Sequence, residues 1–181
     1  MSRLNIFVDT EFTDFVDLGL ISIALVANTD PPQEYYVEIT DFDRTKCNDF
    51  VVANVLPNLN KAPGRAMLYD AARDELREWL EQFRDANAVI CYDFVGDYVL
   101  LQELLYQPWR GSEFAKWPAW LETNNIYKQL EPVLLLEYWR DHPEYTQHHA
   151  LHDARSNRAA YVGGGEPQKY LDTIVPRSRA R

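Results

Sequence analysis

The chain has 181 residues, a length that fits one domain, and 46% of them are hydrophobic, which is enough to build a core. Its 18 Lys and Arg residues against 28 Asp and Glu residues give a formal charge of −10, which argues against a protein that coats nucleic acid. An enzyme that holds only a few nucleotides remains compatible, because carboxylates that surround divalent cations are neutralised in the loaded site.

The cysteines and the apolar runs bear on the cellular compartment. Cys47 and Cys91 lie far apart and form no CxxC motif, which argues against a disulfide framework and against a zinc site built from cysteines. The longest apolar run, Leu20–Ala27, is too short to span a bilayer, and no signal-peptide pattern begins the chain. We expect a protein of the cytoplasm with no membrane partner.

Three strands are predicted in the first part of the chain. Leu4–Asp9 contains consecutive apolar residues, Leu20–Ala27 is apolar almost throughout, and Glu34–Thr40 alternates between apolar and polar side chains. Turn residues fill the connection between the second and the third segment. Because the connections are short, the three strands are expected to form an antiparallel meander.

The hydrophobic period becomes helical after Pro63–Gly64. An amphipathic helix is predicted from apolar residues at helical spacing, namely Leu68, Leu76, Trp79, Leu80 and Phe83. Ala88–Tyr92 predicts a buried strand, and Asp97–Tyr106 predicts a helix that starts near Gly96. This part of the chain therefore returns once to the sheet between two helices.

The last part of the chain predicts a loop, two helices and a tail. Pro108–Trp120 is punctuated by Pro and Gly and predicts a loop, while Leu130–Asp141 and Ala150–Val162 predict helices. The order of elements predicts an α/β fold in which helices flank a mixed sheet. We expect a single domain over the whole chain, with its core at about 4–170 and a basic tail at 176–181.

Two carboxylates at the end of the first strand raise the question of a metal site. Asp9 and Glu11 are two residues apart, so their side chains point to the same face of a strand. Two like charges this close repel each other unless a cation lies between them, and carboxylate oxygens suit Mg²⁺ or Mn²⁺. Alone, the pair is also compatible with a strand end whose carboxylates reach solvent.

Two more acidic motifs follow along the chain. Asp93 ends the fourth predicted strand and Asp97 opens the next helix, and His148 precedes Asp153 of the last helix by five residues. Each is compatible with an ordinary structural role, since a helix dipole favours an acid in the first turn and loop histidines are common. In combination with the acidic strand, the three motifs predict one site.

The combination resembles the motifs of the DEDDh branch of 3′–5′ exonucleases, which share an RNase H-like fold. The family motif D-x-E-x-T-G matches DTEFTD, N-x-x-F-D meets DFVGD, and H-R-A-L-x-D-A meets HHALHDA. The stretches DTEF, LISIALVA, EYYVEITDF and NVLPNL are most similar to a bacterial exoribonuclease group of the RNase AS type. Asp14 and Gly96 depart from the family pattern, which concerns the substrate side of the site.

The resemblance implies a mechanism with two divalent cations, Mg²⁺ or Mn²⁺. The metal ligands that it implies are Asp9, Glu11, Asp97 and Asp153. It implies that His148 acts as the general base and accepts the proton of the attacking water. The implied activity is hydrolysis of single-stranded RNA from a free 3′ end with release of nucleoside monophosphates, and the implied assembly is a homodimer.

Other functions remain compatible with the sequence. The same fold would suit an exonuclease of single-stranded DNA or an oligoribonuclease, and the charge of −10 gives some weight to a catalytically silent nucleic-acid-binding or scaffold protein. A zinc site that used His148 and His152 is less favoured, since only His142 and His149 remain as further histidine ligands. An HD-type phosphohydrolase site at His152–Asp153 would need a distant histidine, and none precedes His142.

Candidate substrate contacts lie close to these motifs. Arg155 and Arg158 are compatible with phosphate contacts or with a solvated helix face. Four aromatic residues are compatible with base stacking or with core packing, namely Phe12, Phe15, Tyr92 and Phe94. Three tryptophans of the Pro108–Trp120 loop are compatible with a substrate rim or a subunit contact, namely Trp109, Trp117 and Trp120.

Overall fold

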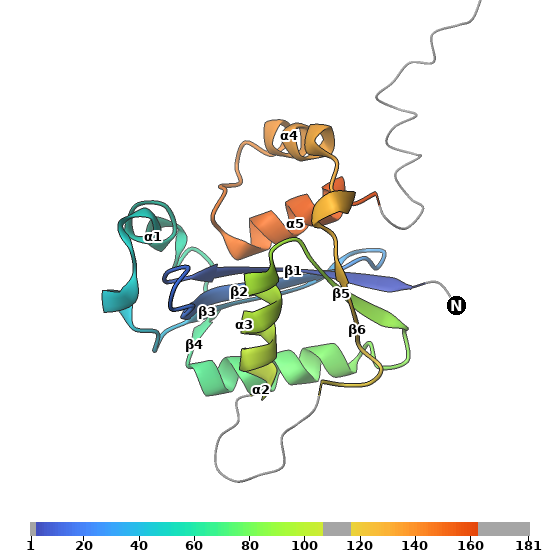
Figure 1. Cartoon of the computed structure of the whole chain (residues 1–181), viewed down its shortest axis with the longest axis horizontal. Helices are drawn as coiled ribbons and strands as arrows, with labels where there is room; N and C mark the ends of the chain where they lie inside the picture. The colour runs from blue at the N-terminus through green and yellow to red at the C-terminus, as the bar shows by residue number, and fades with distance from the viewer. Residues whose placement is uncertain (1–2, 107–116, 163–181) are drawn as a thin grey trace, which may run out of the picture.

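A six-stranded mixed sheet forms the centre of the computed structural model, which describes residues 3–106 and 117–162 (Figure 1). The strands are β1 (Leu4–Phe12), β2 (Leu20–Ala27), β3 (Gln33–Ile39), β4 (Ala66–Met67), β5 (Ala88–Tyr92) and β6 (Glu122–Asn125). Their order in the sheet is β4-β3-β2-β1-β5-β6. The predicted basic tail and residues 107–116 of the predicted loop lie outside the described residues.

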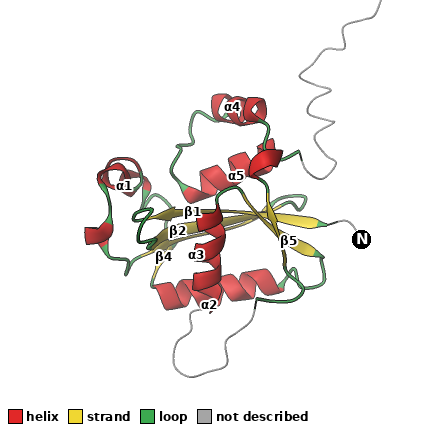
Figure 2. Ribbon diagram, in the orientation of Figure 1, coloured by secondary structure: helices red, strands yellow, loops and turns green. Residues whose placement is uncertain are grey.

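Helices cover both faces of the sheet (Figure 2). They are α1 (Asp49–Asn54), α2 (Tyr69–Glu81), α3 (Val95–Tyr106), α4 (Pro132–Asp141) and α5 (Ala150–Ala160). Helices α2 and α3 lie on one side of the sheet, and α4 and α5 lie on the other (Figure 1). Within the described part of the chain, no helix is both long enough and apolar enough to cross a membrane.

The predicted fold class is confirmed: the chain forms an α/β fold with a mixed sheet flanked by helices, consistent with an RNase H-like fold. The first three strands form the predicted antiparallel meander, and β5 and β6 join β1 in parallel. One α-helix and two strands among the described residues were not predicted, namely α1, β4 and β6. Helix α1 and strand β4 are very short, and β6 has the polar sequence ETNN because it is an edge strand.

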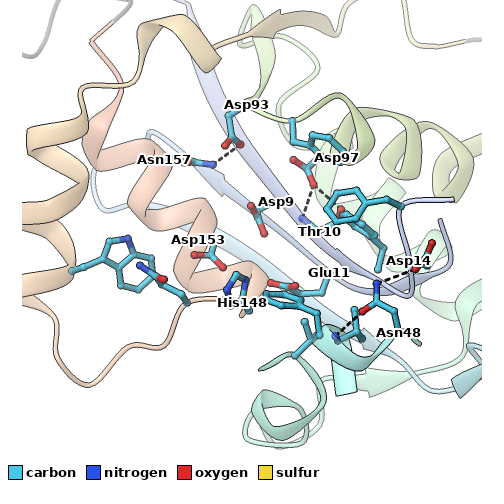
Figure 3. A pocket seen from close by; sticks show the side chains of 18 residues that line it. Asp9, Thr10, Glu11, Asp14, Asn48, Asp93, Asp97, His148, Asp153 and Asn157 are labelled. Atoms are coloured by element: carbon cyan, nitrogen blue, oxygen red, sulfur yellow. Dashed lines mark hydrogen bonds between the residues drawn. The ribbon is translucent and has the colours of Figure 1, made fainter. Parts of the chain in front are cut away.

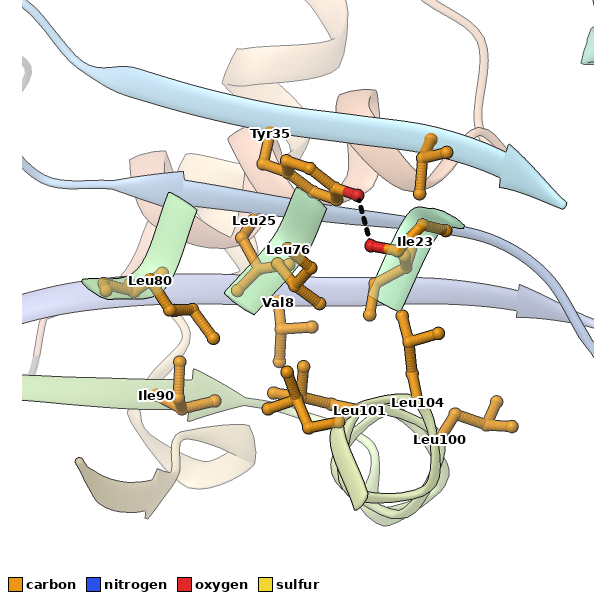
Figure 4. Close-up of a cluster of buried hydrophobic side chains, with 14 of the residues drawn as sticks. Val8, Ile23, Leu25, Tyr35, Leu76, Leu80, Ile90, Leu100, Leu101 and Leu104 are labelled. Atoms are coloured by element: carbon orange, nitrogen blue, oxygen red, sulfur yellow. Dashed lines mark hydrogen bonds between the residues drawn. The ribbon is translucent and has the colours of Figure 1, made fainter. Parts of the chain in front are cut away.

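The alternation of side chains along β1 separates two environments. Val8 points to the side of α2 and α3 and joins the largest buried cluster, which includes Leu76 of α2 and Leu101 of α3 (Figure 4). Ile6 belongs to the same cluster. Phe7 points to the opposite side, where it packs with apolar residues of β5 and with Ile126. By the same alternation, Asp9 and Glu11 follow Phe7 onto the face that α5 covers.

Strand β1 extends past its parallel neighbour, and this creates the place for the acidic side chains. It pairs with β2 from Ile6 to Phe12 but with β5 only from Leu4 to Phe7. The predicted end of this strand at Asp9 was therefore too early, because β2 continues to supply backbone partners. Asp9 and Glu11 lie beyond the last β5 pair, beside the point where β5 ends.

Candidate metal centre

Five carboxylates from separate parts of the chain point toward one centre (Figure 3). They come from β1, from the end of β5 with the first turn of α3, and from α5; they are Asp9, Glu11, Asp93, Asp97 and Asp153. One oxygen each of Asp9, Glu11 and Asp153 lie within 4.8 Å of one another, and so do oxygens of Asp9, Asp93 and Asp97. Asp9 therefore belongs to two groups, each of which is compact enough to hold a cation.

The four carboxylates that the sequence motifs single out are thus brought together, and the structure adds Asp93 to them. In the sequence, Asp93 ends the fourth predicted strand at a position where the resembled family has Asn, and the resemblance does not imply it as a metal ligand. Its side chain accepts a hydrogen bond of 2.8 Å from Nδ2 of Asn157, which fixes it beside Asp9. The position of Asp93 directly after a strand parallel to β1 could have indicated that it joins the site, since the carboxyl ends of parallel strands meet at one edge of a sheet.

Backbone and hydroxyl donors orient the two carboxylates that lie on helices, Asp97 of α3 and Asp153 of α5. The backbone N–H of Thr10 donates to Oδ1 of Asp97 at 3.1 Å, and the Thr10 hydroxyl donates to the same oxygen at 2.7 Å. Oδ2 of Asp153 accepts from the backbone N–H of His149 at 3.1 Å, at the start of α5. In Asp97 and in Asp153, these hydrogen bonds go to one carboxylate oxygen and limit the rotation of the group. The second oxygen of each carboxylate accepts none of them.

Burial together with mutual repulsion disfavours the charged forms of this cluster. Burial, followed by the negative charges of Asp97 and Asp153, raises the pKa of Asp9 well above its usual range. Burial is also the largest cause that raises the pKa of Glu11 to about 9, of Asp97 to about 8 and of Asp153 to about 7. The hydrogen bonds from Thr10 lower the pKa of Asp97, but they only limit the increase that burial causes.

These properties fit hard divalent cations. Mg²⁺ and Mn²⁺ prefer oxygen ligands, and five carboxylates supply them from two groups that share Asp9. A cation would also remove the repulsion that keeps protons on the cluster, because it favours the ionised carboxylates. The donor set thus suits Mg²⁺ or Mn²⁺ better than zinc, since no histidine or cysteine belongs to either group among the described residues.

His148 lies beside the carboxylates but outside both groups. It is on the loop before α5, it lines the same pocket, and Figure 3 shows its ring near Glu11 and Asp153. Its backbone has φ of 60°, the left-handed conformation, which is uncommon for residues other than Gly. The rings of Phe50 and His148 form a T-shaped contact, with their centroids 4.9 Å apart.

The neighbouring histidines belong to a stack of rings outside the pocket. The His149 ring stacks between Tyr36 and His152, at centroid distances of 4.7 and 4.1 Å, and His152 stacks on Tyr145 at 4.4 Å. Nδ1 of His152 accepts a hydrogen bond of 3.1 Å from the backbone of Thr146. Neither His149 nor His152 lines the pocket, so the arrangement gives no support to a zinc site from His148 and His152.

The carboxylates line a pocket of about 520 Å³ that five aromatic side chains line as well. The aromatic lining comes from β1, the loop after it, α1, the turn before α3, and α4: Phe12, Phe15, Phe50, Phe94 and Trp139. The rings of Phe12 and Phe94 stack with their centroids 5.9 Å apart, and Phe15, which is 72% exposed, makes a T-shaped contact with each of them. The pocket therefore offers flat apolar surfaces next to the acidic groups.

Several residues that the sequence suggested as substrate contacts do not line the pocket. Tyr92 stacks on Tyr98 instead of facing the pocket. Arg155 forms two hydrogen bonds with the carboxylate of Glu34, and Arg158 donates to Asn28. Trp117 and Trp120 pack against the largest buried cluster, and Trp109 lies outside the described residues. Across residues 3–106 and 117–162, no Lys or Arg lines the pocket, so its charge comes from acids alone.

Comparison with the known protein families finds no family that matches the chain, and comparison with curated proteins finds no match either. The interpretation of the site therefore depends on its own residues and geometry. Those residues form an acidic centre with two cation-sized groups, one histidine beside it, and an aromatic rim.

Proposed function

We propose that the protein is a two-metal 3′–5′ exoribonuclease that hydrolyses single-stranded RNA from the 3′ end and releases nucleoside monophosphates. The observation that carries this proposal is the pair of carboxylate groups that share Asp9. Two cations held by one common ligand are close enough to act on the same phosphate, and phosphodiester hydrolysis uses such a pair. The motifs that resemble the DEDDh exonucleases supply four of these five residues, all except Asp93.

In this proposal the cations would neutralise the phosphate and the leaving oxygen when bound. Asp9, Glu11, Asp97 and Asp153 would hold them, and Asp93 would support the group around Asp97. His148 would accept the proton of the attacking water at a ring nitrogen, because it lies next to the acidic centre without belonging to either group.

The aromatic rim favours a single-stranded substrate. Unpaired bases expose both faces and stack on aromatic side chains, with little dependence on the base. Phe15 and Phe94 are the exposed aromatic residues of the rim nearest to Phe12 of β1. Bases of the 3′-terminal nucleotides would stack here while the last phosphate reaches the carboxylates.

The compartment and the assembly remain proposals of the same kind. We propose that the enzyme acts in the cytoplasm, where the two cysteines, Cys47 and Cys91, would stay free as they are in the structure. We also propose a homodimer, which is implied by the resemblance alone. Sedimentation of the purified protein at several concentrations tests the dimer.

The decisive experiment follows 5′-labelled single-stranded RNA in a gel assay with Mg²⁺, with Mn²⁺ or with a chelator. We expect a ladder of labelled products shortened from the 3′ end only when metal is present, with the unlabelled nucleoside monophosphates detected by chromatography of the same reaction. Rapid cutting of circular RNA would instead indicate an endonuclease. Asp153→Asn serves as the inactive control, because the label and the preparation stay the same.

Matched substrates separate the alternatives. Single-stranded DNA of the same sequence and RNA of two to thirty nucleotides distinguish a DNA exonuclease and an oligoribonuclease from a general exoribonuclease. Calorimetric titration with Mn²⁺ tests a catalytically silent scaffold protein. Absence of metal binding, together with absence of turnover on every substrate, would favour that scaffold.

A further inference from the structure

The segment formed by α1 and the short 3₁₀ helix after it, η2 (Leu56–Asn58), contacts the loop that carries His148. This segment is far from the acidic motifs in the sequence, and it contributes none of the carboxylates. Its side chain Asn58 is buried, with 8% of its surface exposed. A buried amide needs partners for its donors and its acceptor, so the contacts of Asn58 indicate what it holds.

The amide nitrogen of Asn58 joins two parts of the chain. Nδ2 lies 2.9 Å from the carbonyl oxygen of Asn54 in its own segment. It also lies 3.2 Å from the carbonyl oxygen of Gln147 and 3.0 Å from that of His148, ninety residues further along the chain. Two of its three contacts therefore go to the loop before α5.

The orientation of this amide is fixed from its other end. Nζ of Lys61 lies 3.1 Å from Oδ1 of Asn58. Because a lysine ammonium can only donate, the atom that faces it is the oxygen, and the amino group then faces the carbonyl groups. Lys61 and the 147–148 backbone thus hold the side chain of Asn58 in one orientation.

The loop that Asn58 contacts has an uncommon backbone conformation. His148 has φ of 60°, in the left-handed region that residues other than glycine adopt at a cost, so contacts that hold this backbone favour it. The ring of Phe50 in α1 contacts the imidazole of the same residue. The α1–η2 segment therefore contacts both the ring and the backbone carbonyl of His148.

We propose that Asn58 is a positioning residue for His148: its amide holds the left-handed backbone of His148 so that the imidazole faces the carboxylates. Asn58 does not line the pocket and acts only through His148. This role rests on the proposed function of His148 as the proton acceptor. Loss of Asn58 should therefore affect turnover more than binding of RNA or metal.

Asn58→Ala removes the three contacts of the amide nitrogen and the contact of its oxygen with Lys61. Asn58→Ser keeps one hydroxyl donor as a milder variant. Asn54→Ala is the matched control, because Asn54 is an exposed asparagine of the same segment whose amide donates to the carbonyl of Phe50 at 2.9 Å. We expect Asn58→Ala to lower kcat at least about tenfold with little change in KM, Asn58→Ser to lower it less, and Asn54→Ala to leave it unchanged. The loss should stay within that of His148→Ala, on the order of 10²–10⁴-fold.

The double variant Asn58→Ala with His148→Ala separates positioning from general damage. If Asn58 acts through His148, its substitution should cost nothing further once the imidazole is absent. A loss by the same factor in both backgrounds would overturn the proposal. So would a wild-type kcat in Asn58→Ala.

A second readout does not depend on turnover. In the metal-free protein with ¹³C-labelled histidine, the ring signals of the four histidines can be followed by NMR, and His148→Ala identifies the signal of His148. We expect Asn58→Ala to shift this signal and Asn54→Ala to leave it in place; an unchanged signal would overturn the positioning role. If the wild type degrades no RNA, the proposed function fails, while this spectrum still decides whether Asn58 positions His148.

Discussion

The two faces of β1 differ in what their side chains contribute. Ile6 and Val8 point to α2 and α3 and are fully buried in the largest apolar cluster. Asp9 and Glu11 point to α5 and join carboxylates from three other positions. The same nine-residue strand therefore carries the centre of the hydrophobic core on one face and the candidate metal centre on the other.

This difference indicates that one face of β1 contributes stability and that the other contributes activity at the expense of stability. Apolar burial on the α2–α3 face stabilises the fold in proportion to the area removed from water. The buried acids on the α5 face repel one another and have raised pKa values, so without cations they oppose the folded state. We expect changes on the first face to alter stability and changes on the second face to alter activity.

Substitution of the shared carboxylate should give the largest effect. We expect Asp9→Asn to abolish most turnover, because Asp9 belongs to both groups, and Glu11→Gln, Asp97→Asn and Asp153→Asn to follow it. Without metal, the free energy of unfolding in urea should stay unchanged or increase, because one charge leaves a repelling cluster. Asp85→Asn, in an exposed turn, is the control. A wild-type rate in Asp9→Asn would remove it from the site.

Removal of the imidazole should give the next largest effect on activity. General-base catalysis contributes on the order of 10²–10⁴-fold, so His148→Ala should lower the turnover of RNA on that scale and bind Mn²⁺ nearly as the wild type does. His142→Ala is a suitable control, because His142 caps α4 and does not line the pocket. Loss of Mn²⁺ binding in His148→Ala would instead make His148 a ligand.

On the apolar face, truncation of a core side chain should act on stability alone. Leu76 of α2 is fully buried in the largest cluster, so Leu76→Ala should lower the free energy of unfolding by about 2–5 kcal/mol. Leu136→Ala, on the surface of α4, should change it by less than about 0.5 kcal/mol. Chemical denaturation measures both. If Leu76→Ala also weakened Mn²⁺ binding in the folded protein, the two faces would not be independent.

The smallest expected effect is a dependence of stability on pH, which should come from the acidic face of β1 alone. The folded protein has raised pKa values of about 9 for Glu11, 8 for Asp97 and 7 for Asp153. In the unfolded chain these groups titrate near pH 4, so between about pH 4 and 9 the folded state binds more protons. The stability that these protons provide is complete at low pH and is lost as the pH rises through the folded pKa values.

Thermal unfolding with a chelator, at several pH values from 6 to 9, measures this dependence. We expect Tm of the metal-free protein to fall over this range, and Asp153→Asn to fall less steeply. With Mg²⁺ the fall should shrink or reverse, since cations bind the ionised carboxylates and their binding strengthens as protons leave. A Tm that rises with pH in the chelator would contradict the electrostatic account of this face.

Local patterns in the sequence were sufficient for most elements of the fold. Alternation and apolar runs predicted β1, β2, β3 and β5, and helical spacing predicted α2 to α5, because burial of one face imposes these periods wherever an element packs on a core. The acidic motifs, with the resemblance that they support, singled out Asp9, Glu11, Asp97 and Asp153 before any geometry. Acidic residues next to apolar strands can be identified as candidate site residues from the sequence, because buried acids are rare unless something compensates their charge.

Only the tertiary structure decided what these acids share and what supports them. Asp93 joined the cluster because parallel pairing brings the end of β5 beside β1, a contact between residues more than eighty positions apart. The polar strand β6 and the short α1–η2 segment carry no strong period, so their places depend on partners that lie far along the chain. Asn58 reads in the sequence as an ordinary turn residue, and its contact with the backbone of His148 exists only because the two segments pack together in the fold.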